Sequence, residues 1–264
     1  MNDHVLAKAA ILLSASWCQQ SMVQAAEIRV LSAIAVKSSI DELSQTFEHS
    51  TGHRVVISYD TAGKLRTRIQ SGEAADMTIL PKPAFEPLVA TGQIQPAEKV
   101  VIARSTVGVS VRAGAPKPNI ASVDALKRSL RDAKSIVYTD PSQGGLSGVH
   151  FVRVLEQLGM LEEMKPKTKL TTVASGIGPA EVVAKGEAEL AVSQTADLLL
   201  NSAGADYVGP LPSELQNTSD FLFFGGILTG AKEADAAKAF IRYLVSPEAA
   251  RVIKSKGMEP GSAP

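Results

Sequence analysis

Three lysines of the sequence stand where a positive charge can meet a negatively charged ligand. Lys37 and Lys64 fall in the first turns of expected helices, and Lys82 ends an expected strand. A lysine is disfavoured beside the positive end of a helix, so its presence there favours a role in ligand binding. The alternative for each is a solvated surface charge. We predict that the three lysines contribute to an anion site.

Neutral donors accompany these charges. The stretch 60–82 is typical of a turn, a helix and a strand, in which Thr61 caps the helix and Ala62 lets the backbone approach a ligand. Ser147 follows a glycine-rich turn, and Ser193 and Gln194 end another expected strand. Because unpaired N–H groups at a helix start attract anions, we predict an anion site at the mouth of an open α/β sheet.

A proton-transferring group is harder to find. His150 has a suitable ordinary pKa, although a lone histidine inside a helix is more often structural or exposed. Lys37 or Lys82, if removed from water among other lysines, is a second kind of candidate base. The three therefore stand as alternative catalytic residues. We expect no metal and no cofactor, because the single cysteine, Cys18, lies in the N-terminal segment and the sequence contains no HExxH, Walker-type or dinucleotide-binding motif.

Composition limits the partners. The 264 residues include 27 basic and 27 acidic side chains, which gives no reason to expect nucleic acid as a partner. Residues 1–25 are typical of a signal peptide, with the apolar run Ala9–Trp17 and small residues before Ala26. No later apolar run is long enough to span a membrane. We therefore expect a periplasmic protein with no membrane insertion.

The elements that position these residues alternate between strand and helix. Expected strands are 28–34, 54–59, 77–80, 100–111, 135–138, 169–173, 189–193 and 221–229; expected helices are 36–49, 83–91, 122–130, 147–158, 176–185, 195–202, 234–244 and 247–256. The alternation of strand and helix begins again after residue 110, and this second series predicts a second lobe. We expect lobe I over residues 26–105 and 223–264, and lobe II over residues 106–222.

This order of segments resembles the type II periplasmic solute-binding proteins of ABC importers, and among them the molybdate-binding family. The resemblance rests on VLSAIAVKSSIDELSQTFEHSTGHRV (30–55), DTAGKLRTRIQSGEAADMTIL (60–80), GEAELAVSQTADLL (186–199) and AKAFIRYLVSPEAARVIKSKGM (237–258). It implies an α/β fold of two lobes, each a mostly parallel sheet flanked by helices, with a two-strand hinge and a ligand buried between the lobes.

The sequence departs from that family at its ligand positions. Ala35 stands where the family presents a serine, Thr61 and Ala62 where it has two serines, and Ser193 where it has a tyrosine. Lys82 ends a strand where the family has an aspartate. Fewer fixed hydroxyls and more positive charge suit a larger, flexible carboxylate. We therefore expect a di- or tricarboxylate in contact with these residues, Ala35 included.

Proteins of the same fold include a branch of periplasmic enzymes, the aconitate isomerases. The signal peptide and the departures from the molybdate-binding family are compatible with this branch. Their reaction moves a proton along a three-carbon allylic unit and requires no metal or redox cofactor. The sequence thus predicts a cis/trans-aconitate isomerase. The alternative is a solute-binding protein that delivers an organic or inorganic anion to an ABC permease.

Overall fold

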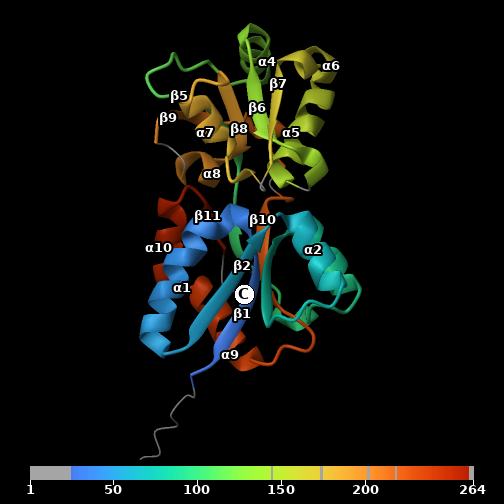
Figure 1. The fold of residues 1–264 in the computed structure, drawn as a ribbon, viewed down its shortest axis with the longest axis vertical. Coiled ribbons are helices and arrows are strands. Elements are labelled where there is room, and N and C mark those ends of the chain that lie inside the picture. Colours follow the sequence, from blue (N-terminus) through green and yellow to red (C-terminus); the bar gives the residue numbers. More distant parts are fainter. Residues whose placement is uncertain (1–24, 144, 173–174, 201–202, 218, 262–264) are drawn as a thin grey trace, which may run out of the picture.

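Two lobes lie one above the other along the long axis of the molecule, as the computed structural model in Figure 1 shows. The structure describes residues 25–143, 145–172, 175–200, 203–217 and 219–261. The predicted signal peptide and Cys18 lie outside the described residues, apart from Ala25. The expected two-lobed α/β fold is therefore confirmed.

The first lobe, lower in Figure 1, contains a six-stranded sheet in the order β11-β4-β10-β3-β1-β2. Its strands are β1 (Glu27–Ala33), β2 (Arg54–Asp60), β3 (Met77–Pro81), β4 (Val100–Arg104), β10 (Leu222–Ile227) and β11 (Glu259–Pro260). Its helices are α1 (Lys37–Thr51), α2 (Ala62–Gln70), α3 (Lys82–Ala90), α9 (Ala234–Leu244) and α10 (Pro247–Ser255). Apolar residues of α1, α9 and α10 pack on one face of the sheet, and those of α2 and α3 on the other.

The second lobe contains a five-stranded sheet in the order β7-β6-β8-β5-β9. Its strands are β5 (Val107–Arg112), β6 (Ile136–Thr139), β7 (Thr168–Thr171), β8 (Leu190–Gln194) and β9 (Ala205–Pro210). Its helices are α4 (Val123–Asp132), α5 (Leu146–Gln157), α6 (Leu161–Met164), α7 (Pro179–Ala184) and α8 (Thr195–Leu200). One face packs against α4, α5 and α6, and the other against α7 and α8.

Both sheets are mixed, so the expectation of mostly parallel sheets is wrong. β1 pairs in parallel with β2 and β3, but β10 is antiparallel to β3 and β4. In the second lobe, β6 is parallel to β7 and β8, whereas β5 is antiparallel to β8 and β9. Two neighbouring strands joined by a helical crossover run parallel. The chain enters β5 and β10 from the other lobe instead, and such a connection does not require the strand to run parallel to its neighbours.

The chain crosses between the lobes in two segments that contact each other. The expected single strand 100–111 is divided, because β4 ends at Arg104 in the first sheet and β5 begins at Val107 in the second. The backbone N–H of Ser105 donates to the carbonyl of Phe221 at 3.0 Å. The side-chain amide of Gln216 donates to the Val107 carbonyl at 2.7 Å and accepts from the Val107 N–H at 3.1 Å.

A buried carboxylate joins the centre of the first lobe to its C-terminal helices. Asp76 is 4% exposed; its Oδ2 accepts from the Arg29 N–H at 2.8 Å, and its Oδ1 accepts from the N–H groups of Lys232 and Glu233, both at 2.9 Å. The Asp76→Ala variant is expected to lose about 3 kcal/mol of unfolding free energy, because three backbone donors lose their acceptor. Urea denaturation measures this, and the exposed Asp235→Ala is the control, expected within about 0.5 kcal/mol of wild type. Equal stability of the two variants would contradict the role given to Asp76.

Candidate functional site

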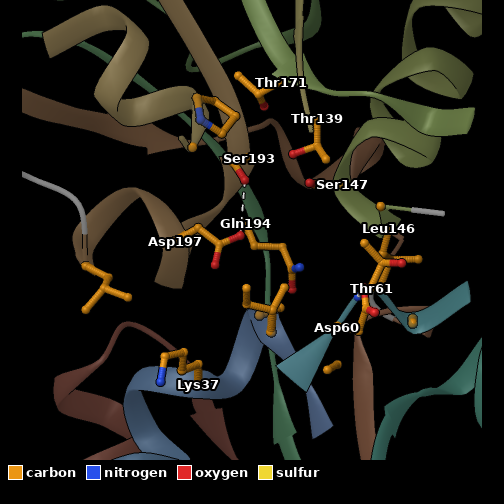
Figure 2. Close-up of a pocket in the computed structure, with 18 of the residues that line it drawn as sticks. Lys37, Asp60, Thr61, Thr139, Leu146, Ser147, Thr171, Ser193, Gln194 and Asp197 are labelled. Carbon is orange, nitrogen blue, oxygen red and sulfur yellow. Dashed lines mark hydrogen bonds between the residues drawn. The ribbon is translucent and has the colours of Figure 1, made fainter. Parts of the chain in front are cut away.

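A cavity of about 340 Å³ lies between the lobes, where strands end and helices begin (Figure 2). The first lobe lines it with Ala33, Ile34, Ala35, Lys37, Asp60, Thr61, Ala62, Pro81 and Phe223. The second lobe lines it with Thr139, Gly145, Leu146, Ser147, Thr171, Thr172, Gly176, Ile177, Gly178, Pro179, Glu181, Ser193, Gln194, Asp197 and Leu200. Its volume lies in the range of about 300–1,000 Å³ typical of small-molecule sites.

Two helices begin at this cavity without a side-chain cap. Among the described residues, no side-chain cap is found at the start of α5, which follows Gly145, or at the start of the short 3₁₀ helix Ile34–Val36 that leads into α1. The N–H groups of such a turn have no intrahelical acceptor and attract negative charge. The start of α2 differs, because the Thr61 hydroxyl accepts from the Lys64 N–H at 3.4 Å. Two of these helix starts thus offer backbone donors to an anion in the cavity.

Two glycines allow the start of α5 to pack closely at the edge of the cavity. A Cβ atom on Gly148 would lie 1.8 Å from the carbonyl oxygen of Thr139, and one on Gly145 would lie 2.7 Å from the Thr139 methyl group. Neither position tolerates a side chain without movement of the backbone or of Thr139. Close packing of α5 on the end of β6 therefore depends on these two glycines.

Hydroxyl and amide groups line the second-lobe side. Ser147 is 4% exposed, and within the described part of the chain its hydroxyl has no hydrogen-bond partner. Gln194 extends from the second lobe toward the first, and its buried Oε1 likewise has no partner in the described structure (Figure 2). Thr139 and Thr171, at the ends of β6 and β7, place two more hydroxyl groups along the same wall. A buried polar atom without a partner costs free energy, so the Gln194 oxygen favours a polar ligand, and the hydroxyl groups add further polar contacts on the same wall.

Asp197 brings a carboxyl group to the cavity. Its Oδ2 accepts a hydrogen bond from the Ser193 hydroxyl at 3.2 Å, the dashed line in Figure 2. Burial raises the pKa of Asp197 from 3.8 to about 7, and the Ser193 hydrogen bond opposes this rise. A carboxyl group with a pKa near neutrality can both accept and release a proton at physiological pH.

Lys37 lines the cavity, but its ammonium group is already engaged. It forms an ion pair with Asp41 and lies 4.5 Å from the ring centroid of Tyr59, which itself donates to Asp41 at 2.7 Å. In Figure 2 its nitrogen turns away from Gln194 and Asp197. Burial and the neighbouring Asp41 raise the pKa of Tyr59, so this cluster holds a neutral phenol beside an ion pair.

Three other predicted residues do not line the cavity. Lys64 lies 3.9 Å from Asp60, with its ammonium group partly exposed, and Lys82 donates to the Ser219 hydroxyl at 3.0 Å. The ring of His150 is buried in the second lobe, where its Nε2 lies 2.8 Å from the Leu215 carbonyl oxygen. Burial lowers the pKa of His150. The residues that the cavity does bring together are Ala35, Lys37, Thr61, Ala62, Ser147, Ser193 and Gln194.

Three further polar residues line the cavity and were not predicted: Asp197, Thr139 and Thr171. The two threonines end parallel strands of an open sheet, the edge at which such sheets bind ligands, and that rule was available from the strand pattern. Asp197 stands four residues after Ser193, in the first turn of the helix that follows this strand end, and its carboxylate accepts a hydrogen bond from the Ser193 hydroxyl. This spacing was the signal that could have identified it.

Comparison with known proteins agrees with this architecture. Residues 28–259 match the family model described as bacterial extracellular solute-binding protein. An aconitate isomerase of Pseudomonas sp. is 32% identical over 238 residues, covering 88% of this chain and 87% of the relative. The molybdate-binding protein ModA of Azotobacter vinelandii is 30% identical over 248 residues, covering 89% of this chain and 90% of the relative.

Solved structures give the same result for the fold. The periplasmic molybdate-binding protein of Azotobacter vinelandii superposes with a TM-score of 0.72 at 20% identity, covering 90% of this chain and 99% of that protein. The predicted resemblance to molybdate-binding proteins, with an aconitate isomerase branch, is confirmed. Among the described residues, no helix combines the length and the apolar composition needed to cross a bilayer. This chain belongs to the bacterial extracellular solute-binding protein family.

Proposed function

We propose that this protein interconverts cis- and trans-aconitate by an allylic proton shift in the cavity between its lobes. The observation that carries the proposal is the pairing of uncapped helix starts from both lobes with the carboxyl group of Asp197 in one cavity. The sequence relationship to an aconitate isomerase supports the same reaction. A tricarboxylate needs several separate donor groups, and the cavity offers them on opposite walls.

The carboxylates are bound mainly by neutral donors. Ser147 and the first N–H groups of α5 form one group of donors, and the start of the 3₁₀ helix at Ala35 forms a second. The hydroxyl of Thr61 and the backbone at Ala62 form a third, on the first-lobe wall. Because these groups come from both lobes, a molecule that engages all three bridges the lobes and favours their closure.

Most of the positive charge near this cavity lies beside its wall, and only Lys37 among the described basic residues lines it. Asp60 lines the cavity, where its charge opposes an anion, but Lys64 and Arg68 each lie 3.9 Å from its carboxylate oxygens. They reduce the repulsion that Asp60 exerts on a bound carboxylate. Lys37 supplies the positive charge nearest to the ligand among the described lining residues, and Asp41 fixes its position.

A solute-binding role in import is the second candidate. The relationship to a molybdate-binding protein at 30% identity favours it, since the name of that relative describes binding of an anion. In that case an ABC permease is the partner. Under either function we place the protein in the periplasm, delivered by the signal peptide predicted over residues 1–25.

One comparison separates the two functions. Purified protein covering residues 26–264 is incubated with trans-aconitate, and the cis isomer is followed by chromatography. We expect conversion until the two isomers reach equilibrium. Calorimetric titration with molybdate, sulfate and trans-aconitate accompanies the assay. Tight binding of molybdate together with unchanged aconitate would reject the isomerase and support the importer.

A further inference from the structure

We infer that Asp197 is the single acid and base of this protein, taking the proton from one carbon of the substrate and returning it to another. The assignment rests on the proposed isomerase function and names its catalytic residue. Asp197 lies in the first turn of α8, directly after the strand end that carries Ser193 and Gln194. All three side chains line the cavity, and Figure 2 shows the carboxyl group beside Gln194.

The position of α8 brings this carboxyl group to the boundary between the lobes. Ala196 of α8 packs into the core of the first lobe, although the helix belongs to the second. A Cβ atom on Gly257, just after α10, would lie 2.4 Å from the side chain of Leu199. A residue on this helix can therefore contact a ligand that is bound between the two lobes. An acid–base group that acts on the carbon chain of the substrate needs such a position.

The other charged residues that line the cavity are less suited to proton transfer. Lys37, from the start of α1, is ion-paired with Asp41. Asp60, at the end of β2, accepts from the Thr61 N–H at 2.8 Å and has Lys64 and Arg68 nearby. These groups are held by fixed partners.

Asp197 differs in its partners. The described residues that surround it give it one hydrogen bond, from the neutral hydroxyl of Ser193, and no cation. Glu181 of α7 is the remaining charged residue of the cavity wall, and Tyr207 of β9 donates to or accepts from Thr195 at 3.2 Å. A carboxyl group without a cationic partner changes its charge at little electrostatic cost to its neighbours.

The proton balance of the reaction needs one such group. The Asp197 carboxylate takes a proton from the methylene carbon of aconitate; that C–H bond breaks, and its electron pair spreads over the allylic unit and its carboxylates. Asp197, now protonated, gives the proton to the far carbon of the same unit, where a new C–H bond forms and the double bond has moved. The enzyme and the substrate end with the atoms and charges with which they began.

The near-neutral pKa suits both steps. General acid–base catalysis is most effective when the pKa of the catalytic group lies near the working pH. Burial places the pKa of Asp197 at about 7, and the Ser193 hydrogen bond keeps it from rising further. Ser193 is therefore a positioning residue, which orients the carboxyl group and sets its pKa.

The test compares Asp197→Asn with the wild-type protein covering residues 26–264. The variant is expected to lose about 1,000-fold in turnover of trans-aconitate, within the range of about 100- to 10,000-fold typical of a lost acid–base group. Its affinity for trans-aconitate, measured by calorimetry, is expected to stay within about threefold, because the neutral amide removes no substrate contact. Asp235→Asn, on the exposed side of α9, is the matched control and is expected to retain full turnover.

A pH profile provides a second readout. For the wild type, kcat/KM is expected to rise about tenfold per pH unit below pH 7 and to level off above it. In Ser193→Ala, the midpoint is expected to move to higher pH, because the hydrogen bond that favours the carboxylate is gone. Asp197→Asn that keeps more than a tenth of wild-type turnover refutes this assignment alone. A wild-type protein that leaves aconitate unchanged refutes the proposed function and the assignment with it.

Discussion

At pH 8, the Asp197→Asn variant is expected to be more stable than the wild-type chain by about 2–4 kcal/mol. The pKa of Asp197 rises from 3.8 to about 7 in the folded protein, so above pH 7 the folded state carries a partly buried carboxylate that the unfolded chain keeps in water. Asparagine has nearly the same shape and no charge. The variant therefore removes a cost that the wild type bears at neutral and alkaline pH.

The sign of the pH dependence follows from the direction of this shift. Because the pKa is raised on folding, the favourable contribution of the protonated group is complete below pH 3.8 and is lost as the pH rises through about 7. Urea denaturation at pH 8 and pH 5 is the measurement. The stability difference between variant and wild type is expected to shrink to about 1–2 kcal/mol at pH 5. A difference that stays constant between the two pH values would contradict the raised pKa.

The Ser147→Asp variant is expected to bind trans-aconitate about 100-fold more weakly, if not to lose binding altogether. Ser147 lies in the uncapped first turn of α5, where its hydroxyl and the neighbouring N–H groups face the cavity. An aspartate there accepts those N–H groups itself and repels the ligand. The helix start favours this negative charge, which opposes the cost of burying it, so the thermal stability is expected to change little.

This combination of weaker binding with intact stability identifies the start of α5 as a ligand site. Calorimetric titration measures the affinity, and a thermal unfolding curve measures the stability. Ser142→Asp adds the same charge on the exposed turn Pro141–Gln143 and is expected to change affinity less than about threefold. If both variants bind equally well, the carboxylate lies elsewhere in the cavity.

Both expected results follow from the same property of the cavity. The cavity attracts anions through backbone and hydroxyl donors, yet it contains a carboxyl group whose charge is costly there. Such a conflict is common at functional sites, where local stability is given up for chemistry. The stability test on Asp197 needs no substrate, and the binding test on Ser147 needs no turnover.

The sequence by itself determined the local elements and seven of the residues that line the cavity. Strands, helices and the Thr61 cap were predictable because hydrophobic periodicity and capping depend on residues no more than about four apart. The order of segments also carried the family. The strand ends and helix starts at Ala35, Ser147, Ser193 and Gln194 do line the cavity, because a parallel arrangement places such ends together.

The tertiary structure decided the chemistry of that cavity. It divided the segment 100–111 between two sheets and made both sheets mixed. It left Lys64, Lys82 and His150 outside the cavity lining, and it directed Asp197 into the cavity. These outcomes depend on contacts between residues that are far apart in the sequence, where the two lobes pack together. Charge and hydrophobic periodicity are local patterns, and they do not show which side of a helix start faces the other lobe.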